Sequence, residues 1–223
     1  MKKTKFGPTL ACVNLMDVKS DVEVLDELGA DTYHIDIMDG CFVPNYCLSW
    51  DFIRQLIEIT DTPVDVHLMT ENVDRDIDTA LSLSIDALAF HVEAIGDTEG
   101  RIRRIKEHRV KAGLAICPST PIGEVEKWLG FVDYVLLMGV KPGFFGQKFL
   151  QETFGRLQTL CSIRKSSQLA LEIYVDGGID FEVAKRCVEI GADILVAGKP
   201  TIFREKGKLR EDTLRLRQML GRP

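Results

Sequence analysis

The sequence predicts an α/β protein folded as a single-domain (β/α)₈ TIM barrel, on three observations. Eight short apolar segments alternate with eight segments of helical amphipathic pattern over 223 residues, as repeated strand–helix units require. No Gly- or Pro-rich linker and no change in composition divides the chain, so we expect one domain over residues 1–223. The first predicted strand is not followed by the G-x-G-x-x-G turn typical of a doubly wound open sheet, the competing fold, which also usually has fewer strands.

The elements are expected in strict alternation along the chain. Short apolar segments predict strands over residues 6–12, 31–38, 63–69, 86–91, 111–117, 132–138, 169–175 and 193–197. Apolar residues at helical spacing predict helices over residues 18–28, 51–59, 73–83, 98–108, a short one after Pro121, and 150–166, 181–190 and 211–220. Two junctions support this count. Gly29 and Gly191 each stand between a predicted helix and the strand that follows, as a glycine C-cap does.

Composition excludes several classes of function. The formal net charge of −6 gives no electrostatic footprint for nucleic acid, and no apolar run reaches the roughly 18 residues that span a bilayer. The basic start of the chain lacks the apolar region of a signal peptide. Six cysteines form neither a CxxC pair nor a disulfide-like framework. We therefore expect a cytoplasmic protein of a reducing compartment, with neither nucleic acid nor membrane as partner.

The second predicted strand carries an unusual polar face. In the stretch from His34 to Gly40, strand alternation places His34, Asp36 and Met38 on one face and the isoleucines on the other. Burying an imidazole and a carboxylate without partners costs several kcal/mol. Taken alone, this pattern is typical of a satisfied buried His–Asp pair, so its interpretation depends on the rest of the chain.

Further polar residues fall at the carboxyl ends of other predicted strands, where active sites lie in a barrel of this kind. His67 lies toward the end of the third strand, His91 ends the fourth, and Asp176 follows the seventh. Two histidines and two aspartates suit one divalent metal ion, and nitrogen and oxygen ligands without thiolate suit Zn²⁺, Fe²⁺, Mn²⁺ or Co²⁺. His67 alone would be interpreted as a core histidine, and His91 as a supporting or a purely structural residue.

Three glycine-containing stretches predict an anion site. Residues 140–147 follow the sixth strand, residues 176–178 the seventh and residues 197–199 the eighth. Glycine lets backbone N–H groups approach a ligand closely, and the loops after the last two strands of such barrels frequently bind phosphate. Each cluster alone is explained by turn formation, but three at consecutive strand ends indicate a phosphate site.

The sequence resembles the ribulose-phosphate 3-epimerase family over nearly its whole length. The resemblance rests on the stretches Pro8-Thr9-Leu10, His34-Ile35-Asp36-Ile37-Met38-Asp39-Gly40, Phe42-Val43-Pro44-Asn45, Asp65-Val66-His67-Leu68-Met69, Pro142-Gly143-Phe144-Phe145-Gly146-Gln147-Lys148-Phe149, Val175-Asp176-Gly177-Gly178-Ile179 and Val196-Ala197-Gly198. It implies a barrel enzyme that inverts C3 of a ketose phosphate, interconverting ribulose 5-phosphate and xylulose 5-phosphate. Close relatives in the family act on allulose 6-phosphate, and members are often dimers or hexamers, so we expect a homo-oligomer.

The chemistry of such an inversion agrees with the residues. One carboxyl group must remove a proton from one face of C3 and another must deliver a proton to the opposite face, which suits Asp36 and Asp176. The intermediate is a cis-enediolate, whose charge a cation would stabilise. By resemblance, the metal ligands are His34, Asp36, His67 and Asp176. The resemblance and the strand-end positions together predict the substrate-binding residues Thr9, His67, Met38, Met69, Met138, Gly143, Phe144, Phe145, Gly146, Gly177, Gly178, Gly198 and Lys199.

Some of these assignments have alternatives. The three methionines would form a water-excluding wall round the intermediate or simply fill the core at the strand ends. Lys141, Phe145 and Lys199 depart from the family pattern. The two lysines make the mouth of the barrel more positive, Lys199 would contact phosphate or point to solvent, and Phe145 would narrow the pocket. A sugar-phosphate or orotidine-phosphate decarboxylase is disfavoured because its Asp-x-Lys-x-x-Asp array is missing, and a simple binding protein would need neither aspartate.

Overall fold

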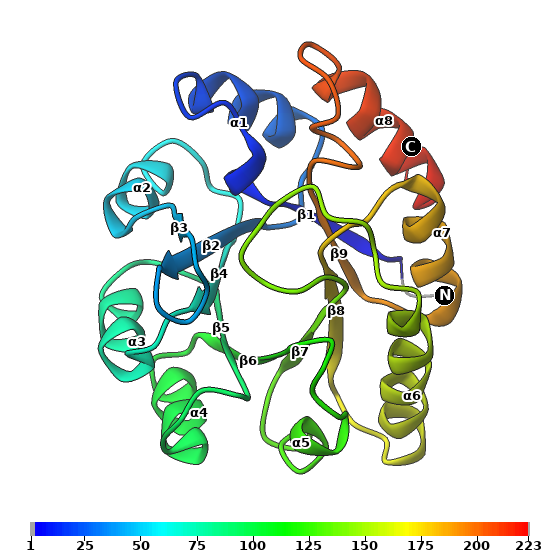
Figure 1. Cartoon of the computed structure of the whole chain (residues 1–223). Helices are drawn as coiled ribbons and strands as arrows, with labels where there is room; N and C mark the ends of the chain where they lie inside the picture. The colour runs from blue at the N-terminus through cyan, green and yellow to red at the C-terminus, as the bar shows by residue number, and fades with distance from the viewer. Residues whose placement is uncertain (1–2, 223) are drawn as a thin grey trace.

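The computed structural model describes residues 3–222, and its strands form one curled sheet (Figure 1). Their bounds are β1 (Lys5–Pro8), β2 (Tyr33–Asp39), β3 (Tyr46–Cys47), β4 (Val64–Met69), β5 (Ala87–His91), β6 (Lys111–Ile116), β7 (Tyr134–Met138), β8 (Glu172–Asp176) and β9 (Ile194–Ala197). The order is β1-β9-β8-β7-β6-β5-β4-β2-β3, and every pairing except β2–β3 is parallel.

The sheet closes on itself between β1 and β2. The backbone N–H of Asp31 donates to the carbonyl of Phe6 at 3.1 Å, and Thr9 forms a parallel bridge with His34. Helices surround the ring of strands (Figure 1). They are α1 (Val18–Glu27), α2 (Trp50–Leu56), α3 (Val73–Leu81), α4 (Thr98–Glu107), α5 (Gly123–Glu126), α6 (Glu152–Ser166), α7 (Phe181–Ile190) and α8 (Leu209–Met219). The predicted (β/α)₈ barrel is thus confirmed.

The main difference from the predicted elements lies at the first strand. We predicted strand through residue 12, but β1 ends at Pro8 and Leu10–Cys12 is a 3₁₀-helix, η1. The cause is local, because the Thr9 side chain accepts a hydrogen bond from the Ala11 N–H and caps this turn. The two-residue strand β3 was not predicted. The C-cap prediction holds, since Gly29 and Gly191 have φ of +69° and +122°.

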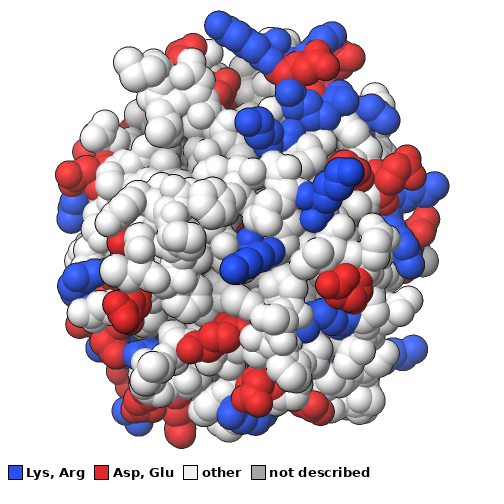
Figure 2. All heavy atoms as spheres, viewed as in Figure 1, with Lys and Arg blue, Asp and Glu red and all other residues white. Residues whose placement is uncertain are grey.

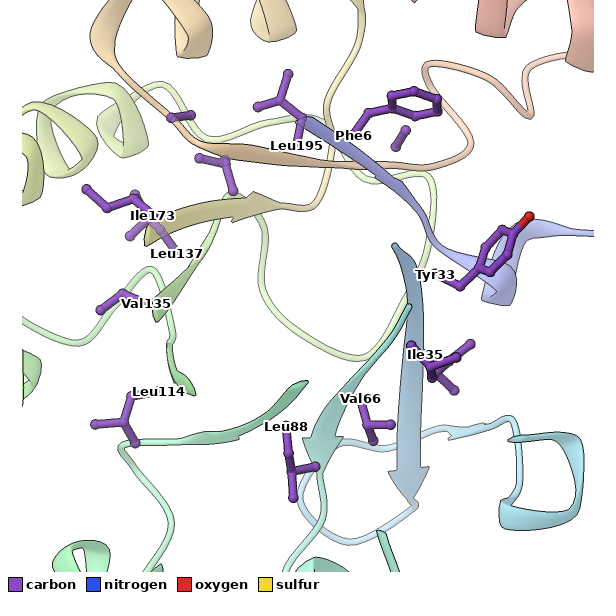
Figure 3. Close-up of a cluster of buried hydrophobic side chains, with 14 of the residues drawn as sticks. Phe6, Tyr33, Ile35, Val66, Leu88, Leu114, Val135, Leu137, Ile173 and Leu195 are labelled. Carbon is purple, nitrogen blue, oxygen red and sulfur yellow. The ribbon is translucent and has the colours of Figure 1, made fainter. Parts of the chain in front are cut away.

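The core has two layers, one on each side of the strands. Outward-facing residues such as Ile35, Val66 and Leu114 are buried between the strands and the helices (Figure 3). The barrel interior holds a separate cluster in which the rings of Tyr134 and Tyr174 stack with centroids 4.3 Å apart. A Cβ at position 113 would lie 2.3 Å from the Tyr134 ring, so only glycine fits beside it.

The stacked tyrosines fill the middle of the barrel, and the polar residues predicted to form the site lie nearer the carboxyl ends of the strands. None of the helices within residues 3–222 is both long and apolar enough to cross a membrane.

Candidate active and metal site

Four side chains meet inside the barrel at the carboxyl end of the strands. His34 and Asp36 come from β2, His67 from β4 and Asp176 from the end of β8. Each offers one ligand atom, and these atoms all lie within 4.8 Å of one another. Alternation along β2 turns His34 and Asp36 inward together, and the register of β2 on β4 places Asp36 beside His67. The four residues that the sequence singled out as metal ligands are therefore brought together.

His34 is held so that one ring nitrogen faces this cluster. Its Nδ1 lies 2.7 Å from Asp65 Oδ2, and the Tyr134 hydroxyl donates to Asp65 Oδ1 at 2.7 Å. Within residues 3–222 its Nε2 has no hydrogen-bond partner, although it is fully buried. This nitrogen lies 3.4 Å from Asp36 Oδ1 and 3.9 Å from Asp176 Oδ2. Metal-binding histidines are usually oriented in this way, by a carboxylate that forms a hydrogen bond with the ring nitrogen that does not bind the metal.

The electrostatics of the cluster favour bound positive charge. Burial disfavours the imidazolium form of His34, yet the carboxylates of Asp36 and Asp65 raise its pKa well above the ordinary value. Burial lowers the pKa of His67 to about 4, despite its 3.0 Å contact with Asp36. A neutral His67, an unpartnered His34 nitrogen and two inward carboxyl groups form a donor set that fits a divalent cation.

The two aspartates differ in their tendency to ionise. Burial opposes ionisation of Asp36, but the nearby charge of His34 and the hydrogen bond with His67 outweigh it and hold the Asp36 pKa well below the usual range. Thr9 also donates to Asp36 Oδ2 at 2.9 Å. For Asp176, burial and the neighbouring carboxylate of Asp36 outweigh the attraction of His34 and raise the pKa to about 7. Near neutral pH one carboxyl can accept a proton while the other can donate one.

A cavity lies at this end of the barrel, beside the cluster. It is lined by all predicted substrate-binding residues except His67, that is by Thr9, Met38, Met69, Met138, Gly143, Phe144, Phe145, Gly146, Gly177, Gly178, Gly198 and Lys199. Asp36 and Asp176 also line it, whereas His67 is not among its lining residues. The three methionines are almost completely buried, with exposed fractions of 6, 2 and 3%. They thus form an apolar wall of the cavity next to the carboxyl groups.

The glycine loops form another part of the wall. Gly177 and Gly178 have φ of +98° and +70°, and a Cβ at Gly178 would lie 2.6 Å from the Phe149 nitrogen, so this turn requires glycine. The loop after β7 is held by Asn45, whose Nδ2 donates to the Gly143 carbonyl at 2.8 Å. Figure 2 shows Lys and Arg side chains over the central part of this face.

Lys141 and Lys199, the two lysines that differ from the family pattern, line different pockets. Lys199 lines the cavity beside the glycine loops. Lys141 lines a neighbouring pocket together with Phe42, Cys117 and Glu152. Phe144 and Phe145 are 55 and 39% exposed and cover the cavity from the loop after β7. Of the two lysines, only Lys199 is therefore placed to reach an anion in the cavity.

Sequence reasoning missed two groups of supporting residues. The first is the pair Asp65 and Tyr134 behind His34. The alternation in Asp65-Val66-His67 already placed Asp65 on the inward face, which was the available signal. The second is Glu93, which lies beside His91, and His91 in turn contacts His67. His91 lies next to the four-residue cluster and is not one of its members.

Comparison with known proteins agrees with this geometry. Residues 5–203 match the model of the ribulose-phosphate 3 epimerase family. The chain is 37% identical to a ribulose-phosphate 3-epimerase of Bacillus subtilis over 195 residues, which is 87% of this chain and 90% of that protein. It is 35% identical to a ribulose-phosphate 3-epimerase of Methanocaldococcus jannaschii over 211 residues, which is 95% of this chain and 89% of that protein.

Solved structures with little sequence similarity share the fold. A 3-hexulose-6-phosphate synthase from Salmonella typhimurium superposes with a TM-score of 0.74 at 13% identity, covering 97% of this chain and 98% of that one. A 3-keto-L-gulonate-6-phosphate decarboxylase from Vibrio cholerae gives a TM-score of 0.73 at 12% identity, covering 98% of each chain. At this level of identity the match concerns the barrel alone, because one barrel hosts many chemistries.

Proposed function

The chain belongs to the ribulose-phosphate 3-epimerase family and is an isomerase, and from this premise we propose that it interconverts ribulose 5-phosphate and xylulose 5-phosphate by proton transfer through Asp36 and Asp176. The observation that carries the proposal is the pair of inward carboxyl groups with opposite pKa shifts, lining one cavity beside a buried histidine nitrogen that has no partner within residues 3–222.

In the metal-free protein, Asp36 and Asp176 have complementary protonation near neutral pH. Asp36 is ionised and is fixed by Thr9 and His67, so it is suited to remove the C3 proton on one face. Asp176, with its raised pKa, is suited to hold a proton and deliver it to the other face. In the reverse direction the roles exchange, because the reverse reaction passes through the same transition states.

One divalent cation would be held by His34, Asp36, His67 and Asp176. When bound, it would stabilise the negative charge that develops on the enediolate oxygens of the substrate. The apolar wall of Met38, Met69 and Met138 would exclude water from this intermediate and limit proton loss to solvent.

The glycine loops would bind the phosphate group. Within residues 3–222, the amide groups of Gly178 and Gly198 donate no hydrogen bond to another backbone group, and both residues line the cavity. Lys199 would add a charge-assisted contact from the same side. Backbone N–H groups in a glycine loop are well suited to a phosphate because they approach it closely.

Allulose 6-phosphate is the alternative substrate. It is one carbon longer than ribulose 5-phosphate and requires the same inversion at C3. Phe144 and Phe145 cover the cavity and would limit the space for the longer sugar, so we assign the pentose phosphate as the substrate.

The test is exchange of the C3 proton in D₂O, with metal-loaded protein and each sugar phosphate offered separately. We expect deuterium incorporation together with epimer formation on ribulose 5-phosphate. Asp176→Asn should abolish epimer formation, because one face loses its proton donor, while Asp51→Asn, an exposed carboxylate on α2, should behave as wild type. Absence of exchange on ribulose 5-phosphate would refute the proposal, and exchange on allulose 6-phosphate alone would reassign the substrate.

A further inference from the structure

The side chain of Asn45 connects two loops at the carboxyl end of the barrel. Asn45 lies in the loop after β2, and its Nδ2 donates to the carbonyl of Gly143, in the loop after β7, at 2.8 Å. The two residues are 98 positions apart in the chain. The orientation of the Asn45 amide is fixed, because its Oδ1 accepts the backbone N–H of Tyr46 at 3.0 Å and leaves Nδ2 directed at Gly143.

The loop that carries Asn45 is itself held by Asp39, at the end of β2. Asp39 Oδ1 accepts the backbone N–H groups of Cys41 and Phe42 at 2.9 and 3.0 Å. Its other carboxylate oxygen accepts the backbone N–H of Glu71, in the loop after β4, at 2.8 Å. The loop after β2 is thereby fastened at its start and joined to the next loop of the barrel. Asn45 therefore holds the loop after β7 from a fixed support.

The contact with Asn45 sets the direction of one peptide group in the loop after β7. In a trans peptide the carbonyl and the following N–H point in opposite directions, so the Phe144 N–H points away from residues 42–45. None of residues 42–45, all of which the structure describes, lines the cavity, whereas Gly143 and Phe144 do. Within residues 3–222, the N–H groups of residues 143–147 donate to no other backbone group. They are left free for an oxyanion.

The loop after β7 also has a hydrogen-bonded shape of its own. Gln147 Nε2 donates to the carbonyls of Lys141 and Phe144 at 2.7 and 2.9 Å. Side-chain amides therefore satisfy three carbonyl groups of this loop and leave its N–H groups unused. Gln147 belongs to the loop, whereas Asn45 joins the loop to another part of the barrel.

We propose that Asn45 is a positioning residue, which holds the loop after β7 over the cavity with its backbone N–H groups free for the phosphate of the substrate. This inference rests on the proposed function, in which a sugar phosphate occupies the cavity. Asn45 does not line the cavity and acts through Gly143. Without this hydrogen bond the loop would adopt the binding arrangement for a smaller fraction of the time, and the apparent affinity would fall by that fraction.

Two variants of Asn45 separate the hydrogen bond from an effect of charge. Asn45→Ala removes the donor and adds no charge. Asn45→Asp keeps an acceptor for the Tyr46 N–H but places a carboxylate oxygen against the Gly143 carbonyl. Asn72→Asp is the matched control, because it adds the same charge in the exposed loop after β4 and still accepts the Arg75 N–H at the start of α3.

The experiment uses metal-loaded protein and measures two quantities. Steady-state assays give KM and kcat for ribulose 5-phosphate, and calorimetric titration gives the dissociation constant of inorganic phosphate. In both Asn45 variants we expect each of KM and the phosphate dissociation constant to rise about three- to tenfold, the factor of one hydrogen bond, with kcat within about twofold of wild type. A purely structural role would instead reduce the amount of active protein, and hence kcat, without changing KM. Asn72→Asp should match wild type.

KM and phosphate affinity within about twofold of wild type in Asn45→Ala would overturn the proposal. An effect confined to Asn45→Asp would also overturn it, because the cause would then be charge. Should Asn45→Asp fail to fold, Asn45→Ala decides the question. If phosphate binding weakens as expected but wild-type protein does not epimerise ribulose 5-phosphate, the proposed substrate fails and the role of Asn45 stands.

Discussion

The substitution Tyr134→Phe removes one hydroxyl oxygen from the middle of the barrel and should lower the free energy of unfolding. Tyr134 is fully buried, and its hydroxyl donates to Asp65 Oδ1 at 2.7 Å. In Tyr134→Phe the ring keeps its stacking on Tyr174 and its contact with Gly113, so the change is confined to one hydrogen bond. Asp65, 1% exposed, would lose one of its donors without gaining water.

A hydrogen bond to a charged group is worth about 1.5–3 kcal/mol. We therefore expect the free energy of unfolding to fall by about 2 kcal/mol, which for a chain of this length corresponds to a Tm lower by about 4–8 °C. Urea denaturation of chelator-treated protein, followed by circular dichroism, measures the first quantity, and a thermal melt measures the second. Chelation removes any contribution from bound metal to stability.

Tyr174→Phe is the matched control. Its ring belongs to the same stack, but its hydroxyl lies 3.5 Å from Glu172 Oε2, at the limit of a hydrogen bond. We expect a loss of about 0.5 kcal/mol or less, because a hydrogen bond of this length is weak. Equal losses in the two variants, or no loss in Tyr134→Phe, would refute the reasoning that the Tyr134–Asp65 hydrogen bond stabilises the interior.

Three further predictions concern the site. Lys199→Ala should raise KM for the sugar phosphate about tenfold with kcat little changed. This is the effect expected when a charge-assisted contact worth about 1.5 kcal/mol is lost. A decrease in kcat without a change in KM in steady-state assays would contradict this prediction. Gly178→Ala should lower the urea midpoint and the yield of folded protein, because residue 178 has φ +70° and its Cβ would lie 2.6 Å from the Phe149 nitrogen. Gly123→Ala is the control, because a Cβ at that position meets nothing within 4 Å. In metal-free protein, Asp176→Asn should be increasingly stabilising as pH rises from about 4 to about 7. The folded state keeps the Asp176 proton up to a pKa of about 7, while the unfolded state releases it near 3.8. The free energy of unfolding of the wild-type protein therefore falls as pH rises between these two values, whereas that of the variant does not. A pH-independent difference in urea midpoints would contradict the raised pKa.

Much of the barrel is encoded in local pattern. Apolar segments at period two and helices at period 3.6 predicted the parallel strands and surrounding helices, because burial of one face is decided by side-chain spacing. The same alternation placed His34 and Asp36 on one face. Glycines at strand ends predicted the loops that line the cavity, because glycine adopts the positive φ observed at Gly177 and Gly178 without the strain that a Cβ would bring.

The tertiary structure decided which groups touch. Register placed Asp36 beside His67, and packing in the barrel interior brought the Tyr134 hydroxyl to Asp65, 69 residues apart in the chain. Spacing along one strand tells which face a residue occupies, but not which residue of another strand lies opposite. The opposite pKa shifts of Asp36 and Asp176 have the same origin, since each depends on burial and on charges contributed by other strands.

The tertiary structure also decides which pocket each of Lys141 and Lys199 lines. Both lysines follow a strand end in the sequence, yet Lys199 lines the cavity while Lys141 lines the neighbouring pocket. The sequence alone determined the barrel, the inward carboxyl and imidazole groups and the glycine loops, because these depend on the period of the chain and on the steric freedom of single residues. Which partner fixes each ionisable group was determined by tertiary packing, because hydrogen bonds and charge interactions act over a few ångströms between residues that are distant in the chain.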